Sequence, residues 1–539
     1  MDERNRMLAM GGQDVDGEWE SMGTGTSSAS LASRTSRYLQ SFISTEVSAR
    51  VMGDRDRNEI LKVAWLSITL FFVVGGYWLL RSIKDPIMAT IDGVEYIPQA
   101  KIASLFVVFA LVIVYNKMLD MFKKEQVFYM MGVTYGIAFG CIAVLLAHPT
   151  IGLANTNADP SRLLGWVSYC TIESFGSMVV QCYWALVNSS VDTNFAKKNF
   201  GIIVAGAQIG SILGPTIATQ AAWIGISSLY FIGAMVMFLM VGAMYLYMDK
   251  FGNAEATRRE EAATYKDKQK DGGIAEGFTL FYEHNYVKGL FAVSSLYMIQ
   301  VTVVDYMMKV LAKDHYHTLY PDDPAMALSG FASFMGYFGQ MTNSISFLFS
   351  LLGTGIVIKN FGLTVTLISF PILLLGCTAL VFFKPDLWTV FFVMMIMKAM
   401  SYALNNPTKE ILYQQTSSAV KFKCKSWIDT FGQRGSKAGG SLITNAFATS
   451  IADLANYGSL VGAIISLFLI YVSDYMGKEF EALTERGEKV GEQSASLAAQ
   501  LAAMQNMHED TSCTIEEEGQ KSAEMTPQGS KKGSDGADV

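Results

Sequence analysis

Apolar runs about the length of a membrane-spanning helix alternate with short polar segments along most of this chain. A helix needs roughly 20 mainly apolar residues to cross a hydrocarbon core of ~30 Å. The pattern predicts six such helices, a polar segment near 250–277, and six more helices. The predicted spans are 60–82, 98–118, 126–147, 163–189, 198–220, 223–248, 286–312, 328–354, 361–383, 387–411, 428–451 and 455–475. We therefore expect an all-α membrane protein with twelve transmembrane helices.

The polar segments predict five parts of the chain. These are a disordered cytosolic tail at 1–57, a six-helix half at 58–249, a cytosolic linker at 250–284, a second six-helix half at 285–476, and a cytosolic helix with a disordered tail at 477–539. Lysine and arginine gather in the loops on the side of the two tails, which predicts that both termini are cytosolic. The opposite loops carry few cations, of which Lys101, Arg162 and Lys384 are the clear cases. An organellar, a symbiont-facing and a plasma membrane stay open as locations.

A weak internal repeat indicates that the two halves share one fold. The run AKKNFGIIVAGAQIGSILG (196–214) aligns with FKCKSWIDTFGQRGSKAGG (422–440). In this alignment, Gly206 corresponds to Gly432, and Gly214 corresponds to Gly440. Two halves of like orientation around a site at mid-membrane are typical of the major-facilitator architecture. For the repeat taken alone, chance similarity between Gly-rich helices is the alternative.

Charged residues are scarce, and their positions inside the predicted spans are therefore informative. The chain is 51% apolar and only 17% charged, whereas soluble domains are about 25% charged. A charge at the bilayer centre costs a few kcal/mol, so such residues usually face a water-filled cavity. Lys84, Glu173, Asp305 and Lys437 lie in or at the edge of these spans. They indicate a path for a charged substrate.

Several of these charges have candidate partners. Glu173 is the single acid of its apolar run, and it must either pair with a cation such as Lys84 or be protonated, which would permit proton coupling. Asp305 and Lys309 are spaced i, i+4 and can pair on one helix face, so a structural ion pair is the alternative to a substrate site. Pro86 follows Lys84 closely and is expected to break the first helix. The alternative role for Lys84 is an interfacial cap.

Cations outnumber acids among the charges inside the membrane. Arg434 and Lys437 lie in a Gly-rich helix, and close helix packing explains the glycines but not the two cations. Arginine is well shaped to hold phosphate, and lysine adds a point charge. The cations are Lys84, Lys309, Lys398, Lys409, Arg434 and Lys437, against the acids Glu173, Asp305 and Glu410. This surplus favours a polyanionic substrate, such as a nucleoside di- or triphosphate or a sugar phosphate.

Nothing in the sequence predicts catalysis or a cofactor. No GxxxxGK[ST] motif or acidic Mg²⁺ cluster is present, so the chain does not read as an ATPase. Its six cysteines contain no CxxC pair, which disfavours a zinc or disulfide framework. Aromatic side chains near the charges are candidates to stack on a base or simply to pack; they are Trp78, Tyr183, Trp184, Tyr306 and Tyr402.

Several motifs resemble those of the plastid and bacterial ATP/ADP translocases. They are LRSIKDPI (80–87), IESFGS (172–177), AKKNFG (196–201), VTVVDYMMK (301–309), NPTKE (406–410) and VKFKCKSWIDTFGQRGSKAGGSLI (420–443). The resemblance implies functional roles for Lys84, Glu173, Asp305 and Lys437. Asp305 departs from the glutamate usual in plastid members. Asn406 and Arg434 are further departures, which implies that strict ATP/ADP exchange is not assured.

Taken with this resemblance, the sequence predicts a monomeric secondary transporter that moves ATP, ADP or other (deoxy)nucleoside phosphates by alternating access and exchange. Its predicted substrate-binding residues are Lys84, Glu173, Asp305, Lys309, Lys409, Arg434 and Lys437. The expected partners are nucleotides, phosphate or protons, and the lipid bilayer, with no nucleic acid and no cofactor. One alternative is a proton-coupled transporter of nucleotides or of another organic phosphate anion. The other is a receptor or scaffold that transports nothing.

Overall fold

A computed structural model of the chain describes residues 56–191, 193–266, 281–417, 420–425, 428–447 and 450–491. Contacts divide the chain into two compact units, Met1–Lys62 and Val63–Val539, and the arrangement described below concerns the second. Across the described ranges the secondary structure is helical, apart from an isolated bridge between Thr416 and Val490. The predicted all-α fold is therefore confirmed. Most of the two predicted tails and part of the predicted linker lie outside the described residues.

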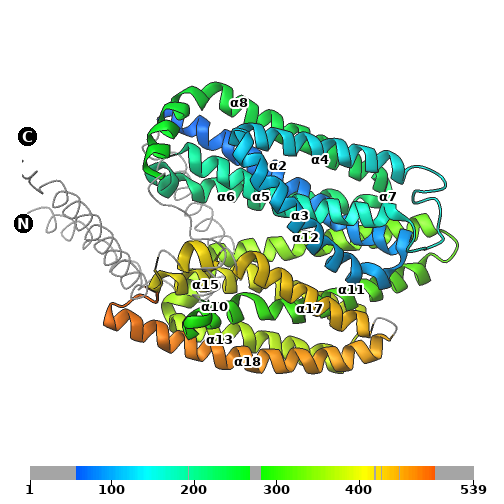
Figure 1. Cartoon of the computed structure of the whole chain (residues 1–539). Coiled ribbons are helices and arrows are strands. Elements are labelled where there is room, and N and C mark those ends of the chain that lie inside the picture. The colour runs from blue at the N-terminus through cyan, green and yellow to red at the C-terminus, as the bar shows by residue number, and fades with distance from the viewer. Residues whose placement is uncertain are drawn as a thin grey trace, which may run out of the picture. The chain divides into compact units, whose positions relative to one another are not determined.

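The helices fall into two groups on either side of the gap at 267–280 (Figure 1). The first helix group comprises α2 (Arg57–Met88), α3 (Ile97–Met121), α4 (Lys124–Leu146), α5 (Leu163–Ser190), α6 (Thr193–Ala218), α7 (Ala221–Ile224) and α8 (Ile226–Lys266). The second helix group comprises α10 (Asn285–Phe291), α11 (Tyr297–Leu319), α12 (Pro324–Leu352), α13 (Thr354–Phe383), α14 (Leu387–Met400), α15 (Asn406–Leu412), α17 (Gln433–Ala446) and α18 (Ile451–Arg486). α8 and α18 continue past the predicted domain boundaries at 249 and 476.

Short π-helical and 3₁₀ segments join several of these helices. The π-helical segments are η1 (Ala89–Gly93), η3 (Ala292–Leu296), η4 (Ser401–Asn405), η6 (Val420–Cys424) and η7 (Ile428–Gly432), and the 3₁₀ segments are η2 (Val94–Tyr96) and η5 (Tyr413–Gln415). η3 joins α10 to α11, and η4 joins α14 to α15, without a turn between them. Each pair therefore forms one long helix with a π-helical interruption.

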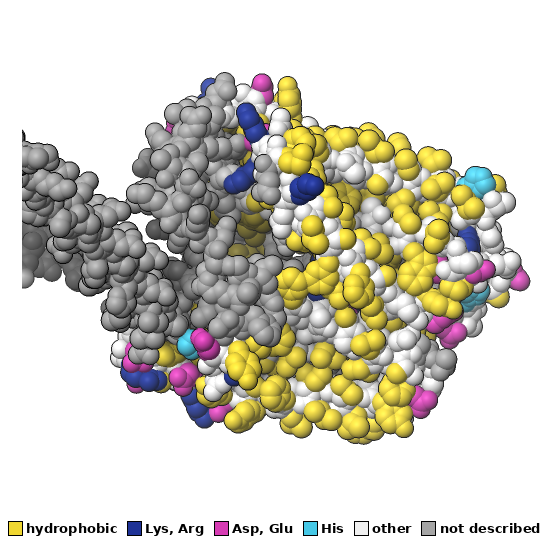
Figure 2. All heavy atoms as spheres, viewed as in Figure 1, with side chains coloured by type: hydrophobic (Ala, Val, Ile, Leu, Met, Phe, Trp, Pro, Cys, Tyr) yellow, Lys and Arg dark blue, Asp and Glu magenta, His cyan; other side chains and the backbone are white. Residues whose placement is uncertain are grey.

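Nine segments of the described chain are long and apolar enough to cross a membrane. One of them, Arg57–Leu119, contains α2 and most of α3, whereas α12 and α17 are not among the nine. α17 has only 14 residues, and α12 carries polar side chains near its middle, including Thr342 and Asn343. Apolar side chains also cover much of the visible outer face of the helices (Figure 2). This is the construction of a multi-pass membrane protein, while the number of twelve spans stays a prediction.

Packing between the helices follows the same pattern in both groups. α4 packs against α8 in the first group, and α13 packs against α18 in the second; the two pairs lie on opposite sides of the bundle (Figure 1). Across the groups, α3 contacts α17 and α6 contacts α12. In each case the second long helix of one group meets the fifth of the other. Two structurally equivalent halves produce this arrangement, which agrees with the repeat in the sequence.

The glycines that align in the repeat serve the same purpose in each group. A Cβ atom on Gly214 would collide with the carbonyl oxygen of Gly75, where α6 crosses α2. A Cβ atom on Gly440 would lie 2.8 Å from the carbonyl oxygen of Ile299, where α17 crosses α11. Small residues let membrane helices approach this closely. The aligned glycines therefore have the same packing role in the two helix groups, as the repeat predicts.

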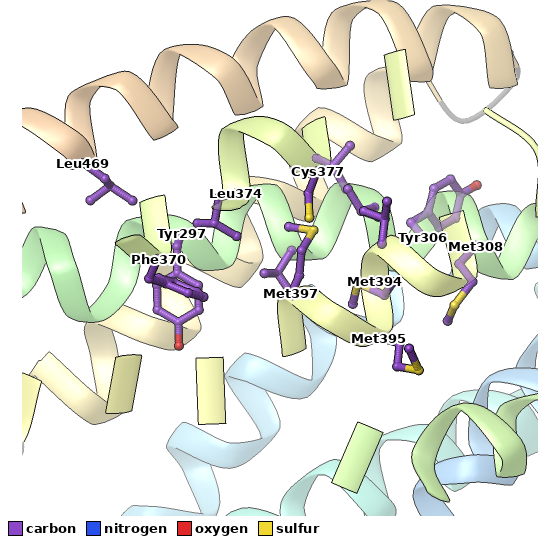
Figure 3. Close-up of a cluster of buried hydrophobic side chains, with 14 of the residues drawn as sticks. Tyr297, Tyr306, Met308, Phe370, Leu374, Cys377, Met394, Met395, Met397 and Leu469 are labelled. Atoms are coloured by element: carbon purple, nitrogen blue, oxygen red, sulfur yellow. The ribbon is translucent and has the colours of Figure 1, made fainter. Parts of the chain in front are cut away.

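Apolar side chains fill the interior of the second group, which holds α11 in place. Figure 3 shows Tyr297 and Phe370 side by side, with ring centroids 5.4 Å apart. Met394 and Met397 of α14 extend the same cluster, and both are fully buried. Because α11 is surrounded by this packing, the charged residues on its other face are held at defined positions.

The prediction that the first helix breaks at Pro86 is wrong. α2 continues through Pro86 and ends at Met88. Proline removes one main-chain hydrogen bond, but Ile83, Ile87 and Met88 are completely buried, and their packing keeps the helix regular. The chain turns only at Gly93, whose φ of +119° suits glycine.

Replacement of Gly214 by alanine is expected to destabilise the protein by about 1–3 kcal/mol, because the added methyl group overpacks the contact between α6 and α2. Gly242 of α8 provides a matched control, since no atom lies within 4 Å of a Cβ placed there. Gly242→Ala should leave the melting temperature in detergent unchanged or raise it slightly. Equal melting temperatures for the two variants would show that the close crossing is unimportant.

Candidate functional site

A cavity lies between the two helix groups. The space between its walls, open solvent included, is about 860 Å³. Its walls come from α2, α3 and α5 on one side and from α11, α14, η4 and α17 on the other. The lining residues are Arg81, Lys84, Lys101, Ser104, Leu105, Glu173, Tyr297, Met298, Val301, Thr302, Asp305, Lys309, Lys398, Ser401, Tyr402, Arg434 and Lys437. We refer to this space as the central cavity.

Cations dominate the wall of the central cavity. Seven lining residues are cationic, namely Arg81, Lys84, Lys101, Lys309, Lys398, Arg434 and Lys437, and two are acidic, namely Glu173 and Asp305. Asp85 is a third acid close by, buried and bonded to two of the lysines. Even with Asp85 included, the positive charge is far from balanced. Such a cavity can hold an anion that carries several charges.

Lys84 forms the predicted pair with Glu173. Its Nζ atom lies 3.3 Å from Glu173 Oε1 and 3.0 Å from Asp85 Oδ1. The ammonium also lies 3.8 Å from the centre of the Tyr169 ring, which favours a cation. Only 3% of the Lys84 side chain is exposed. These contacts compensate a buried charge that would otherwise be very costly.

Asp305 contacts three lysines from three different helices. Its carboxylate lies 2.6 Å from Lys309 Nζ, 2.9 Å from Lys101 Nζ and 3.1 Å from Lys398 Nζ. The predicted i, i+4 pair with Lys309 is therefore confirmed. It is more than a local helix pair, however, because one carboxylate serves three ammonium groups. An anionic substrate would supply the missing negative charge.

Among the described residues, two ion pairs join the helix groups directly. Lys101 of α3 contacts Asp305 of α11, and Asp85 of α2 lies 3.0 Å from Lys309 of α11. A hydrogen bond between the side-chain amides of Gln99 and Asn445 links α3 to α17 nearby, at 2.7 Å. Movement of one group against the other must break or exchange these contacts. The same side chains thus line the cavity and connect its two walls.

α17 presents Arg434 and Lys437 to the cavity, one turn apart. Arg434 donates a hydrogen bond to the hydroxyl of Ser177 on α5. Among the described residues, no hydrogen bond or ion pair holds the ammonium of Lys437. Gly432, directly before α17, and Gly440 allow close contacts with η3 and α11, and this packing turns both cations inward. The two cations remain available to an anion.

Arg81 and Lys101 are cavity residues that the sequence reasoning missed. Arg81 lies three residues before Lys84, on the same helix face, and this spacing was a usable signal. Its guanidinium donates to the Tyr77 hydroxyl at 2.6 Å and lies 5.2 Å from the centre of the Trp78 ring. The assignment of Lys101 to a loop is wrong, because it lies in the second turn of α3 and points to Asp305.

Lys409 is the one predicted site residue that the structure places away from the central cavity. It is buried beside Asp429, with Nζ 3.2 Å from the Asp429 carboxylate. Its neighbour Glu410 binds Lys425 at 2.5 Å. These contacts assign Lys409 to the packing of α15 against η7.

Aromatic residues of the second group accompany the cations on the cavity wall. Tyr297 and Tyr402 line the central cavity, and the Trp78 ring meets Tyr402 edge-on with centroids 6.5 Å apart. Of the other aromatic candidates, Tyr183 and Tyr306 are buried in helix packing and do not line the cavity. Tyr402 lies in η4, where the wider π-helical turn changes the direction of side chains.

The fold and the cavity together define a helical membrane transporter with a positively charged central cavity. Similarity to solved structures agrees with this class at the level of the fold. A bacterial homologue of the iron transporter ferroportin matches 78% of this chain and 100% of its own, with a TM-score of 0.56 and 10% identity. A POT family transporter matches 77% of this chain and 96% of its own, with a TM-score of 0.53 and 12% identity. The fold is thus major-facilitator-like.

The chain belongs to the TLC ATP/ADP transporter family, whose family model matches residues 51–393. The ADP,ATP carrier protein 1 of Rickettsia conorii is 23% identical over 82% of this chain and 97% of its own length. The ADP,ATP carrier protein 1 of Chlamydia trachomatis is 25% identical over 77% of this chain and 88% of its own length. The chloroplastic ADP,ATP carrier protein 2 of Arabidopsis thaliana is 22% identical over 78% of this chain and 74% of its own length. The protein is therefore an integral multi-pass membrane transporter.

Removal of the Asp305 charge should destabilise the protein strongly. Asp305→Asn leaves two buried lysines, Lys309 and Lys398, and the half-buried Lys101 without their shared carboxylate, and the expected cost is about 3–5 kcal/mol. Asp474→Asn is the control, because Asp474 pairs with Lys478 on the surface and such pairs contribute about 1 kcal/mol or less. Thermal unfolding in detergent measures both.

The double variant Asp305→Asn/Lys398→Met tests whether the three lysines act as one unit. Because one unpaired cation is removed, the double variant should lose less stability than the two single variants added together. Strict additivity would mean that Lys398 does not depend on Asp305.

Proposed function

We propose that this protein exchanges nucleotides, chiefly ATP, ADP or other nucleoside di- and triphosphates, across a membrane as a secondary transporter. The observation that carries the proposal is the surplus of cations on both walls of the central cavity. Membership of the TLC ATP/ADP transporter family and the carriers named above support the nucleotide as substrate. The residues proposed to bind it are Lys84, Glu173, Asp305, Lys309, Arg434 and Lys437, with Arg81, Lys101 and Lys398 added.

In the empty state, the acids hold the cations in place. Glu173 and Asp85 contact Lys84, while Asp305 contacts Lys101, Lys309 and Lys398. Phosphate oxygens form strong, charge-assisted hydrogen bonds with the same ammonium groups. A polyphosphate chain therefore competes with the carboxylates and takes over some of their cations. Arg434 and Lys437 provide the first contacts, because neither is held by a carboxylate.

Exchange of partners is the proposed link between binding and movement. The pairs Lys101–Asp305 and Asp85–Lys309 join the two helix groups. When phosphate replaces the carboxylates, the groups lose these direct links and can move around the bound substrate. Without substrate, the links persist and the empty transporter converts slowly. Slow return of the empty form makes transport an exchange of one nucleotide for another, or for phosphate.

The aromatic residues of the cavity are proposed to hold the base. Tyr402 and Tyr297 lie on the wall of the second group, and Trp78 lies against Tyr402. A base can stack on any aromatic face, with an energy of about 1–3 kcal/mol, and with little preference for one base over another. This arrangement suits a transporter that accepts several nucleotides.

Proton coupling is the second candidate mechanism. It requires an acid that binds a proton during the cycle, and Glu173 and Asp305 were the predicted sites. Both acids contact lysines in this structure, which favours their charged forms and argues against the proton-coupled alternative. We keep exchange as the main proposal. We also propose that the protein is a monomer with both termini on the cytosolic side, and that the two halves span 58–249 and 285–476.

Uptake of labelled ATP into proteoliposomes tests the proposed function. Liposomes loaded with ADP should take up labelled ATP, and empty liposomes should take up far less. Lys437→Ala should reduce the exchange rate by about tenfold or more, since one charge-assisted contact to phosphate is lost. Lys478→Ala is the control, because this exposed lysine lies far along α18 outside the cavity. Full activity of Lys437→Ala would remove Lys437 from the site.

A pH gradient separates exchange from proton coupling in the same liposomes. Exchange with internal ADP should continue when the pH is equal on both sides. Uptake into empty liposomes that follows an imposed pH gradient would instead support the proton-coupled alternative.

A further inference from the structure

A second cavity lies beyond the central cavity, at the end of the bundle that holds the loop between α4 and α5. We name this end, with residues 147–162 and 320–323, the loop end. The cavity has about 610 Å³ of space, open solvent included, and Thr90, Thr156, Lys313 and His317 are its polar lining residues. Its other lining residues are apolar or small, and none of the lining residues is acidic. We name it the outer cavity.

The outer cavity and the central cavity are both lined by residues on one face of α11. Lys309, Lys313 and His317 are spaced four residues apart, so they follow one another on the same side of the helix. Lys309 lines the central cavity, and Lys313, one turn further, lines the outer cavity. The ion pair between Lys309 and Asp85 therefore lies about one helical turn from Lys313, on the side of the central cavity. A substrate that moved along this face of α11 from the outer cavity to the central cavity would pass this pair.

Lys313 differs from most of the other buried and half-buried lysines of the bundle. Its neighbour on the helix face, Lys309, contacts both Asp85 and Asp305. Within the described part of the chain, no hydrogen bond or ion pair holds the ammonium of the half-buried Lys313, and the acid that acts on it electrostatically is the exposed Glu95. Removing a lysine from water without a partner is unfavourable. An anion in the outer cavity would provide that partner.

The donors of the outer cavity suit phosphate. Lys313 offers a point charge, and His317 and the hydroxyl of Thr156 offer further hydrogen-bond donors at the rim. The hydroxyl of Thr90 is already committed to the carbonyl oxygen of Pro86, at 3.0 Å. A free carboxylate ligand would also accept these bonds. The substrate of the neighbouring central cavity makes a phosphate group the better fit.

We propose that the outer cavity is a second phosphate-binding site, which holds the polyphosphate of a nucleotide approaching from the loop end. The proposal rests on the proposed function. In this site Lys313 and His317 bind the phosphates while the Asp85–Lys309 pair still closes the central cavity. When that pair opens, the polyphosphate moves one helical turn along α11 and reaches Lys309.

The test is the dependence of the KM on the side from which the nucleotide arrives. Labelled ATP transport is measured in intact bacterial cells that produce the protein and in inside-out vesicles from the same cells, because these present opposite ends of the bundle. Labelling of Lys384→Cys with an impermeant maleimide, compared with the unsubstituted chain, identifies the preparation that presents the loop end. Lys384 suits this purpose because it is exposed and lies between α13 and α14.

Lys313→Gln should raise the KM for ATP from the loop end by about tenfold, with the maximal rate and the KM from the other end unchanged. Lys313→Arg should restore most of the affinity, since it keeps the charge. Lys384→Gln is the matched control, a lysine at the same end outside the outer cavity, and should change neither KM. An unchanged KM in Lys313→Gln, or an equal rise from both ends, would overturn the outer site.

The proposed function and the outer site fail in different ways. If the unsubstituted protein moves no nucleotide in either preparation, the proposed function is wrong. If it moves nucleotides and Lys313→Gln behaves as Lys384→Gln does, only the outer site is wrong.

Discussion

The arrangement of charges in the central cavity depends on the ion pairs of the Asp305 carboxylate. Three lysines from α3, α11 and α14 approach this one group within 3.1 Å. Like charges repel strongly where water is scarce, so the three ammonium groups could not lie this close without it. The carboxylate also leaves the cluster incompletely neutralised. Helix packing therefore holds the lysines in a positively charged arrangement that an anion can complete.

The buried lysines are paired differently in the two halves, although the arrangement of helices is similar. Lys84 and Glu173 in the first half have the same separation along the chain as Lys309 and Lys398 in the second. The first pair is an acid and a base in contact, whereas the second pair consists of two bases that share Asp305. Much of the cation surplus therefore comes from the second half. The charge in the central cavity is therefore distributed asymmetrically, although the two halves are similar.

The π-helical segments of the second half adjust the wall of the central cavity. η3 ends directly before Tyr297, and η4 contains Ser401 and Tyr402, all of which line the cavity. A π-helical turn inserts an extra residue and rotates the side chains that follow it. Lys398 precedes η4 by one turn and reaches Asp305, while Tyr402 turns toward Trp78. The charged Lys398 and the aromatic Tyr402 thus lie on adjacent turns of one helix with a π-helical interruption.

The sequence alone determined the properties that depend on local order. Apolar runs predicted the helices, a four-residue spacing predicted the Asp305–Lys309 pair, and the count of charges predicted an anionic substrate. The tertiary structure decided which helices meet, because periodicity reports the face of a helix and not its neighbour. It brought Lys101 and Arg81 into the cavity, kept Lys409 out of it, and carried α2 through Pro86. Each of these outcomes depends on contacts between residues that are distant in the chain, where burial and ion pairing outweigh local preference.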